Sequence, residues 1–123
     1  MNTITNFKIK GMSPQLQVTD IARSIEFYTT KLGFELDFRY EDFYSGITKD
    51  GYSIHLKSGK PSIDQRKSQE DLDLIFSVDE IKELYEEMVS RSVNIIQPLR
   101  DMPYGQEFYM ADPDGNIIAF LEA

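Results

Sequence analysis

The chain repeats itself at an offset of about 60 residues, and this repeat constrains the fold more than any other feature. Residues 16–18 alternate apolar and polar side chains like a strand, and apolar residues then recur at helical spacing over 21–32. The same strand and helix pattern begins again at residue 76. Asp-Gly pairs at 50–51 and 114–115 each open a further short strand. The sequence therefore predicts two copies of one unit, each with a strand, a helix and about three more strands.

The repeat sets the domain organisation. A chain of 123 residues suits one domain, and we predict module one at about 8–58 and module two at about 71–123. Residues 59–70 between them are rich in Gly, Pro, Ser and charged residues, which is typical of a surface linker. Each module has a single helix to cover its sheet, so we expect the two modules to pair for stability.

Both predicted helices carry start signals. Asp20 is the predicted N-cap of the first helix, and Gly33 is its predicted terminator. Ser77 or Asp79 is the predicted N-cap of the second, since Ser77 and Glu80 have the spacing of a capping box.

Strand alternation sorts the predicted strand residues onto two faces. Nine apolar residues share the parity expected under the helices: Leu16, Val18, Ile54, Leu56, Leu74, Phe76, Val78, Ile118 and Phe120. The opposite face mixes polar and apolar residues, including Gln15, Gln17, His55, Asp73 and Ala119. Such a mixed face fits a small-molecule pocket, a half-exposed sheet or a surface covered by a partner chain.

Composition excludes several classes of function. Thirteen Lys and Arg against 21 Asp and Glu give a net charge of −8, which disfavours nucleic acid and anionic membranes and favours cationic small molecules. The absence of Cys excludes disulfides, thiolate catalysis and zinc–thiolate sites. No apolar run is long enough to span a membrane, and residues 1–10 lack a signal-peptide core, so we expect a cytoplasmic protein.

Two motifs carry a family resemblance. Leu-Gln-Val-Thr-Asp-Ile at 16–21, with Phe-Tyr at 27–28 and Leu-Gly-Phe at 32–34, resembles the first-module signature of the vicinal-oxygen-chelate superfamily. Pro-Tyr-Gly at 103–105 and Asp-Pro-Asp-Gly-Asn at 112–116 resemble its second-module signature. This superfamily includes glyoxalase I, extradiol dioxygenases and bleomycin-resistance proteins. The resemblance implies an α+β fold in which two βαβββ modules form curled mixed sheets around a central cavity, often completed by a second chain.

The resemblance also implies four metal-ligand positions, which map to Ser13, His55, Asp73 and Ala119. Serine is a weak neutral ligand and alanine is none, whereas catalytic metal sites generally keep three protein ligands. We therefore expect no metal cofactor. A divalent metal held by His55 and Asp73, with Glu107 or another residue as a further ligand, is the alternative.

His55, the one histidine of the sequence, is a general base or a hydrogen-bonded residue of a pocket wall or interface. Asp73 is either its orienting partner or a counter-ion for a cationic ligand. Phe38 and Tyr40 lie on a predicted strand where aromatic residues can line the cavity mouth. The resemblance places an aromatic residue near the ligand at the loop position of Tyr104.

The function that the resemblance favours is metal-free binding of a small organic molecule, such as a cationic aromatic one, in the cavity of a homodimer. This is the role of bleomycin-resistance proteins and implies antibiotic resistance rather than catalysis. A metal-dependent lyase, isomerase or dioxygenase is the alternative, and a structural dimer without ligand is the second. The expected ligand contacts are Gln15, Gln17, Phe38, Tyr40, His55, Asp73, Tyr104 and Ala119.

Overall fold

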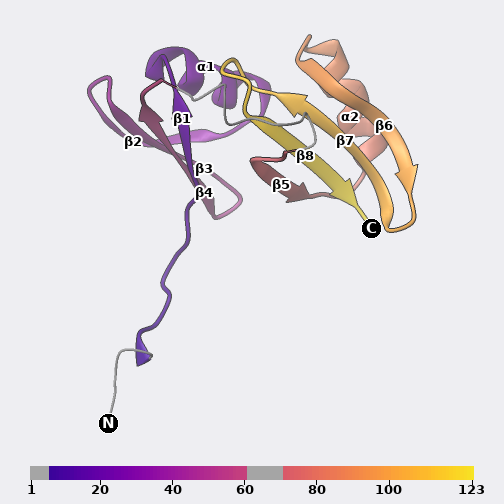
Figure 1. Cartoon of the computed structure of the whole chain (residues 1–123), viewed down its shortest axis with the longest axis horizontal. Helices are drawn as coiled ribbons and strands as arrows, with labels where there is room; N and C mark the ends of the chain where they lie inside the picture. The colour runs from indigo at the N-terminus through magenta and orange to yellow at the C-terminus, as the bar shows by residue number, and fades with distance from the viewer. Residues whose placement is uncertain (1–5, 61–70) are drawn as a thin grey trace.

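The computed structural model, which describes residues 6–60 and 71–123, contains two four-stranded mixed sheets with one helix each (Figure 1). The first module comprises β1 (Gln15–Val18), α1 (Ile21–Lys31), β2 (Glu35–Tyr40), β3 (Tyr44–Lys49) and β4 (Tyr52–Ser58). The second comprises β5 (Leu74–Ser77), α2 (Ile81–Ser90), β6 (Asn94–Met102), β7 (Gly105–Ala111) and β8 (Ile117–Glu122). The sheet orders are β1-β4-β3-β2 and β5-β8-β7-β6. The predicted α+β fold of two βαβββ modules is confirmed, and neither sheet closes on itself.

The helix-covered sides of both sheets share one hydrophobic core. All nine residues assigned to this side by strand alternation belong to the core or pack against it. Val18 and Leu56 of the first sheet and Ile118 of the second are fully buried. The rings of Phe34 and Phe76 meet across the two modules, with 6.2 Å between their centroids. Burial of a shared apolar core is therefore what holds the two modules together.

A polar joint adds to this core at the turn between β7 and β8. Asp114 in this turn accepts hydrogen bonds from the Thr19 hydroxyl at 2.6 Å and from the Arg23 guanidinium at 3.1 Å. The buried Tyr28 hydroxyl donates to Asp112 at 2.8 Å. Burial raises the pKa of Asp112, since it disfavours the charged form of the carboxyl. The Asp-Pro-Asp-Gly segment thus ties the second module to the first helix.

The predicted ends of the first helix are confirmed. The Asp20 carboxylate accepts a hydrogen bond from the backbone N–H of Arg23 at 3.0 Å, as an N-cap does. Gly33 follows the helix with a φ of 76°, a conformation that favours glycine.

The predicted N-cap of the second helix is wrong. Ser77 and Asp79 precede the helix without capping it, and the N-cap is Glu80, whose φ is 54°. The Glu122 carboxylate, from the end of β8, accepts the backbone N–H groups of Glu80 and Ile81 at 3.2 and 3.0 Å. A residue distant in sequence thus takes over the cap, and the capping-box spacing is not used.

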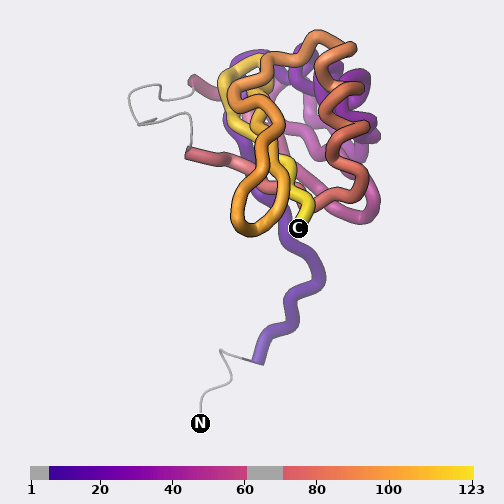
Figure 2. Tube along the Cα trace, turned by 90° about the vertical axis from the view of Figure 1, so that its right-hand side faces the viewer, coloured from indigo at the N-terminus to yellow at the C-terminus, as the bar shows by residue number. Residues whose placement is uncertain are grey.

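Residues 6–12 leave the body of the molecule as an extended arm (Figures 1 and 2). Three large apolar side chains on it are exposed, Phe7 by 71%, Ile9 by 75% and Met12 by 86%. Most of the predicted linker, residues 61–70, lies outside the described residues. Within the described parts of the chain, no helix has the length and apolar character needed to cross a membrane.

Candidate functional site

The side of each sheet that faces away from its helix is called here its open face. On the first sheet, one row across four strands joins Gln15, His55, Gly46 and Phe38, each paired in register with the next. The turn at Asp50 and Gly51 fixes this register, because Lys49 pairs with Tyr52 and the pairs follow from there. The pairing thus brings side chains from β1, β2 and β4 to one patch.

Gly46 gives the patch its floor. A Cβ at this position would overlap the ring of Phe38, so the bare glycine allows that ring to lie against β3. The Phe38 ring is 5.3 Å from the His55 ring at 86° and 6.1 Å from the Tyr44 ring at 18°. Tyr40 completes the group, with its ring 5.5 Å from that of Phe38.

A hydrogen-bond chain runs along the edge of these rings. Gln15 donates through Nε2 to the Tyr44 hydroxyl at 3.1 Å, and this hydroxyl lies 2.8 Å from His55 Nδ1. His55 is half-buried, and so are Phe38 and Tyr44. We call Gln15, Phe38, Tyr40, Tyr44 and His55 the aromatic cluster. A half-exposed set of rings with a few fixed polar groups is the usual make-up of a small-molecule site.

Four of the sequence-predicted contacts meet in this cluster: Gln15, Phe38, Tyr40 and His55. Gln17 pairs with Lys57 in the next row, and its backbone carbonyl accepts from the Asn116 side chain at 3.2 Å. The sequence places Tyr44 among the aromatic residues around β2 and β3 but not among the expected ligand contacts. Counting back from the Asp-Gly turn at 50–51 would have found it, because that count pairs Tyr44 with Lys57.

Tyr104 and Ala119 belong to the other sheet. Ala119 is buried on the open face of the second sheet, between its register partners Ile75 and Tyr109. Ile75 is 61% exposed, although it lies on the same face. Tyr104 is half-exposed at the turn between β6 and β7. The structure therefore does not group these two predicted contacts with the aromatic cluster of the same chain.

Glu107 has a buried carboxylate with three partners. Arg100 donates to it through Nε at 2.9 Å and Nη2 at 2.6 Å, Tyr104 at 2.6 Å and Tyr109 at 3.1 Å. Burial raises the pKa of Glu107, but the hydrogen bonds from Tyr104, Arg100 and Tyr109 outweigh it, so the pKa lies below its ordinary value. The bond to Glu107 in turn raises the pKa of Tyr104 to about 12. Arg100 and Tyr109 had not been singled out from the sequence.

The four positions that the family resemblance assigns to a metal do not fit one. Asp73 accepts the backbone N–H of Ile117 at 2.7 Å, so its carboxylate fixes the start of β8. The Ser13 hydroxyl bonds to the hydroxyl of Ser53, and the fourth position is alanine. Within residues 6–60 and 71–123, no group of three or more His, Asp or Glu side chains could hold a metal ion. Asp73 is also not the hydrogen-bond partner of His55 Nδ1, which is Tyr44.

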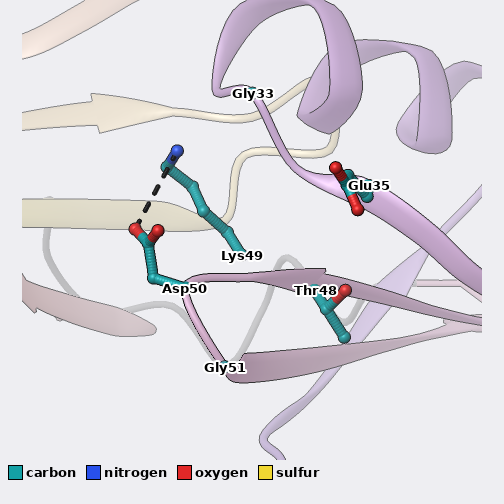
Figure 3. Close-up of a pocket in the computed structure, with 6 residues that line it drawn as sticks. All are labelled: Gly33, Glu35, Thr48, Lys49, Asp50 and Gly51. Carbon is teal, nitrogen blue, oxygen red and sulfur yellow. Dashed lines mark ion pairs between the residues drawn. The ribbon is translucent and has the colours of Figure 1, made fainter.

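A shallow polar pocket of about 270 Å³ lies at the turn between β3 and β4 (Figure 3). Lys49 and Asp50 form an ion pair at 4.0 Å on its rim. The lining consists of Gly33, Glu35, Thr48, Lys49, Asp50 and Gly51. Because it contains no aromatic or apolar side chain, this pocket has little to offer an organic ligand.

Two βαβββ modules with an open face on each sheet define a class of protein, and a comparison with protein families identifies the same class. Residues 12–120 match the model of the Glyoxalase/Bleomycin resistance protein/Dioxygenase superfamily. The chain belongs to this superfamily. Among curated proteins, none matches the chain.

Several solved structures are similar over nearly the whole chain. The bleomycin-binding protein from Streptomyces verticillus, solved with copper(II)-bleomycin, is 25% identical with a TM-score of 0.73, covering 95% of this chain and 98% of that one. A superfamily member from Sphaerobacter thermophilus DSM 20745 is 24% identical with a TM-score of 0.76, covering 94% and 98%. Lactoylglutathione lyase from Agrobacterium tumefaciens is 17% identical with a TM-score of 0.74, covering 91% and 92%. The last two show the fold alone.

Proposed function

We propose that this protein binds a small aromatic molecule without a metal, using the aromatic cluster on the open face of the first sheet. The observation that carries the proposal is the Phe38 ring seated on Gly46 beside the Tyr44–His55 hydrogen bond. Half-exposed rings supply stacking area, and the polar edge supplies orientation. The bleomycin-binding relative supports binding rather than catalysis, since its own structure contains a bound drug complex.

A second copy of the chain completes the binding cavity in this proposal. The two modules of one chain meet through their helix-covered sides, so the half-exposed aromatic cluster on the open face of the first sheet is left available to another chain. Exposed Ile75 on one open face and the exposed apolar residues of the 6–12 arm favour association. Light scattering at micromolar concentration tests this part, and a monomer would contradict it.

A thermal-shift screen of aromatic compounds tests the binding function. A compound at 100 times its dissociation constant stabilises the folded protein by about 2.7 kcal/mol. We expect Phe38→Ala to abolish the shift, whereas Tyr52→Ala, which removes an exposed ring elsewhere on the sheet, keeps it. Absence of any hit would contradict the proposal. So would stoichiometric divalent metal in the purified protein that is lost in His55→Ala, since that result indicates a metal-dependent enzyme.

A further inference from the structure

The hydrogen bonds of Tyr44 determine which nitrogen of His55 carries its proton. The Tyr44 oxygen accepts from Gln15 Nε2, an amide nitrogen that can only donate. The hydroxyl has one proton of its own to donate. In the described part of the chain, His55 Nδ1, 2.8 Å away, is the acceptor available to it. When the Tyr44 hydroxyl donates to it, His55 Nδ1 is unprotonated, and in the neutral ring the proton is on Nε2.

His55 Nε2 then presents a donor with no acceptor of its own. Within residues 6–60 and 71–123, no hydrogen bond uses this nitrogen, and the ring is half-buried beside Phe38. A partly buried donor favours a ligand that brings an acceptor. When a ligand displaces water, leaving the donor without a hydrogen bond costs free energy. His55 thus favours a ligand that carries a hydrogen-bond acceptor.

The positive charge of Lys57, beside the aromatic cluster, also favours a ligand with an oxygen acceptor. Lys57 pairs in register with Tyr44, on the same face and one row from His55, and its side chain is exposed. An ammonium group at this position favours oxygen acceptors, including anionic ones, and disfavours cations.

Three carboxylates near the open faces are either paired with an arginine or lie away from the aromatic cluster. Asp42, at the tip of the β2–β3 hairpin, pairs with Arg39 at 2.6 Å, and Glu107 pairs with Arg100 on the other sheet. Glu35 lies at the far end of β2, beside the polar pocket. The net charge of −8 favours cations at long range, but charges more than about 8 Å apart are largely screened at physiological ionic strength. The nearby donors, His55 Nε2–H and the Lys57 ammonium, therefore determine the charge preference of the aromatic cluster more than the net charge does.

We propose that the aromatic cluster selects a planar aromatic molecule that carries an oxygen acceptor, such as a carboxylate, phenolate or carbonyl, which receives the Nε2–H of His55. This inference rests on the proposed function and names its ligand class. It replaces the preference for a cationic ligand that net charge alone suggests. Phe38 supplies the stacking surface, and Tyr44 acts as the positioning residue that fixes the tautomer of His55.

Three probes with one ring system test the selectivity by calorimetry. Naphthalene-2-carboxylate offers an anionic acceptor, 2-acetylnaphthalene a neutral one, and 2-naphthylmethylammonium a cation without an acceptor. We expect the first two to bind at least about tenfold more tightly than the third. In Lys57→Met, we expect the carboxylate to lose more affinity than the ketone.

Variants separate the hydrogen bond from the stacking. His55→Phe keeps a ring but removes the donor, so we expect both acceptor probes to weaken severalfold. Tyr44→Phe should weaken them severalfold, whereas the matched control Tyr52→Phe removes an exposed hydroxyl on the same sheet, outside the aromatic cluster, and should have no effect. Acceptor binding that is unchanged in His55→Phe, or tighter binding of the ammonium probe, overturns the inference.

A spectroscopic readout tests the tautomer without any ligand. A long-range proton–nitrogen NMR spectrum of the one histidine should show the neutral ring of the wild type as the Nε2-protonated tautomer, and that of Tyr44→Phe as a mixture of tautomers. A wild-type spectrum with Nδ1 protonated overturns the inference. Failure of all three probes to bind overturns it as well, but overturns the proposed function only if the wider thermal-shift screen is also blank.

Discussion

Lys31 and Arg91 each donate a side-chain hydrogen bond to the backbone carbonyl oxygen of the other, at 2.6 and 2.7 Å. The two residues are 60 positions apart, which is the offset of the internal repeat. Equivalent residues of the two modules thus meet at the C-terminal ends of α1 and α2. Because helix C-termini have unsatisfied carbonyl groups and a partial negative charge, a cation from the opposite module is favourable at each.

We expect Lys31→Met to lower the free energy of unfolding by about 1 kcal/mol, since it removes one partly buried hydrogen bond to a carbonyl. Arg91→Met should cost a similar amount for the reciprocal bond. Urea unfolding measures both, with Lys82→Met on the exposed side of α2 as the control. Equal stability of Lys31→Met and Lys82→Met would show that the reciprocal contact contributes nothing.

The N-terminal ends of the two helices break this symmetry. Asp20 and Glu80 are also 60 positions apart and are the two N-cap residues, but only the Asp20 side chain caps its helix. Glu80 adopts a left-handed backbone conformation and leaves the cap to Glu122.

Glu122→Ala should therefore lower the free energy of unfolding by about 0.5–2 kcal/mol, the range for loss of a helix cap. The control is Glu86→Ala, because Glu86 is an exposed carboxylate within α2, the helix that Glu122 caps. Chemical unfolding of the two variants gives the comparison. If Glu86→Ala is as destabilising as Glu122→Ala, the effect is one of general charge and not of capping.

The fold could be predicted from the sequence because its main signals are local. The alternation around Leu16 and Ile54, the N-cap at Asp20 and the two Asp-Gly turns each act within a few residues. Repetition of the strand, helix and Asp-Gly signals about 60 residues later then predicts two similar modules. The cap by Glu122 could not be predicted in this way, because it depends on where the end of β8 lies relative to α2.

The candidate site was predictable in part for the same reason. The β3–β4 hairpin has regular register from its turn, so the positions of Gly46 and Tyr44 relative to His55 follow from counting. The position of Phe38 does not, because the β2–β3 register shifts between Leu36 and Phe38. By contrast, the β6–β7 register shifts twice, between Ile95 and Gln97 and between Gln97 and Arg100. These irregularities decide which residues face Glu107, and no pattern in the sequence reports them.

The Glu107 network predicts an alkaline titration. Tyr104 has a pKa of about 12, and Glu107→Gln removes the charged acceptor responsible, so the pKa should fall toward the ordinary value of about 10. Phenolate absorbance after a rapid pH jump measures this, with the spectrum of a Tyr104→Phe version subtracted in each background. A Tyr104 titration that is the same with and without Glu107 would contradict the assigned bond.

The same network predicts how stability depends on pH. Because the folded pKa of Tyr104 is raised, its contribution is present below about pH 10 and is lost as the pH rises through about 12. Because the folded pKa of Glu107 is lowered, its contribution is present above about pH 4.3 and is lost as the pH falls further. Urea unfolding across pH should show both losses in the wild type and weaker ones in Glu107→Gln. A stability profile that Glu107→Gln leaves unchanged in shape would count against this network.

The contact between Phe38 and Gly46 gives a prediction that links stability to binding. Gly46→Ala places a methyl group where the Phe38 ring lies, and overpacking of this kind costs about 1–3 kcal/mol. In a Phe38→Ala background the same change should cost almost nothing, since the obstructing ring is gone. Gly11→Ala, at a glycine with open space around it, is the control.

Chemical unfolding of the four combinations gives the coupling between the two positions. We also expect Gly46→Ala to weaken aromatic probes at least as much as Tyr44→Phe does, because the displaced Phe38 ring no longer lies beside His55. Equal costs of Gly46→Ala with and without Phe38 would mean that the ring does not rest on this glycine. In that case the Phe38 ring would pack against another residue of β3.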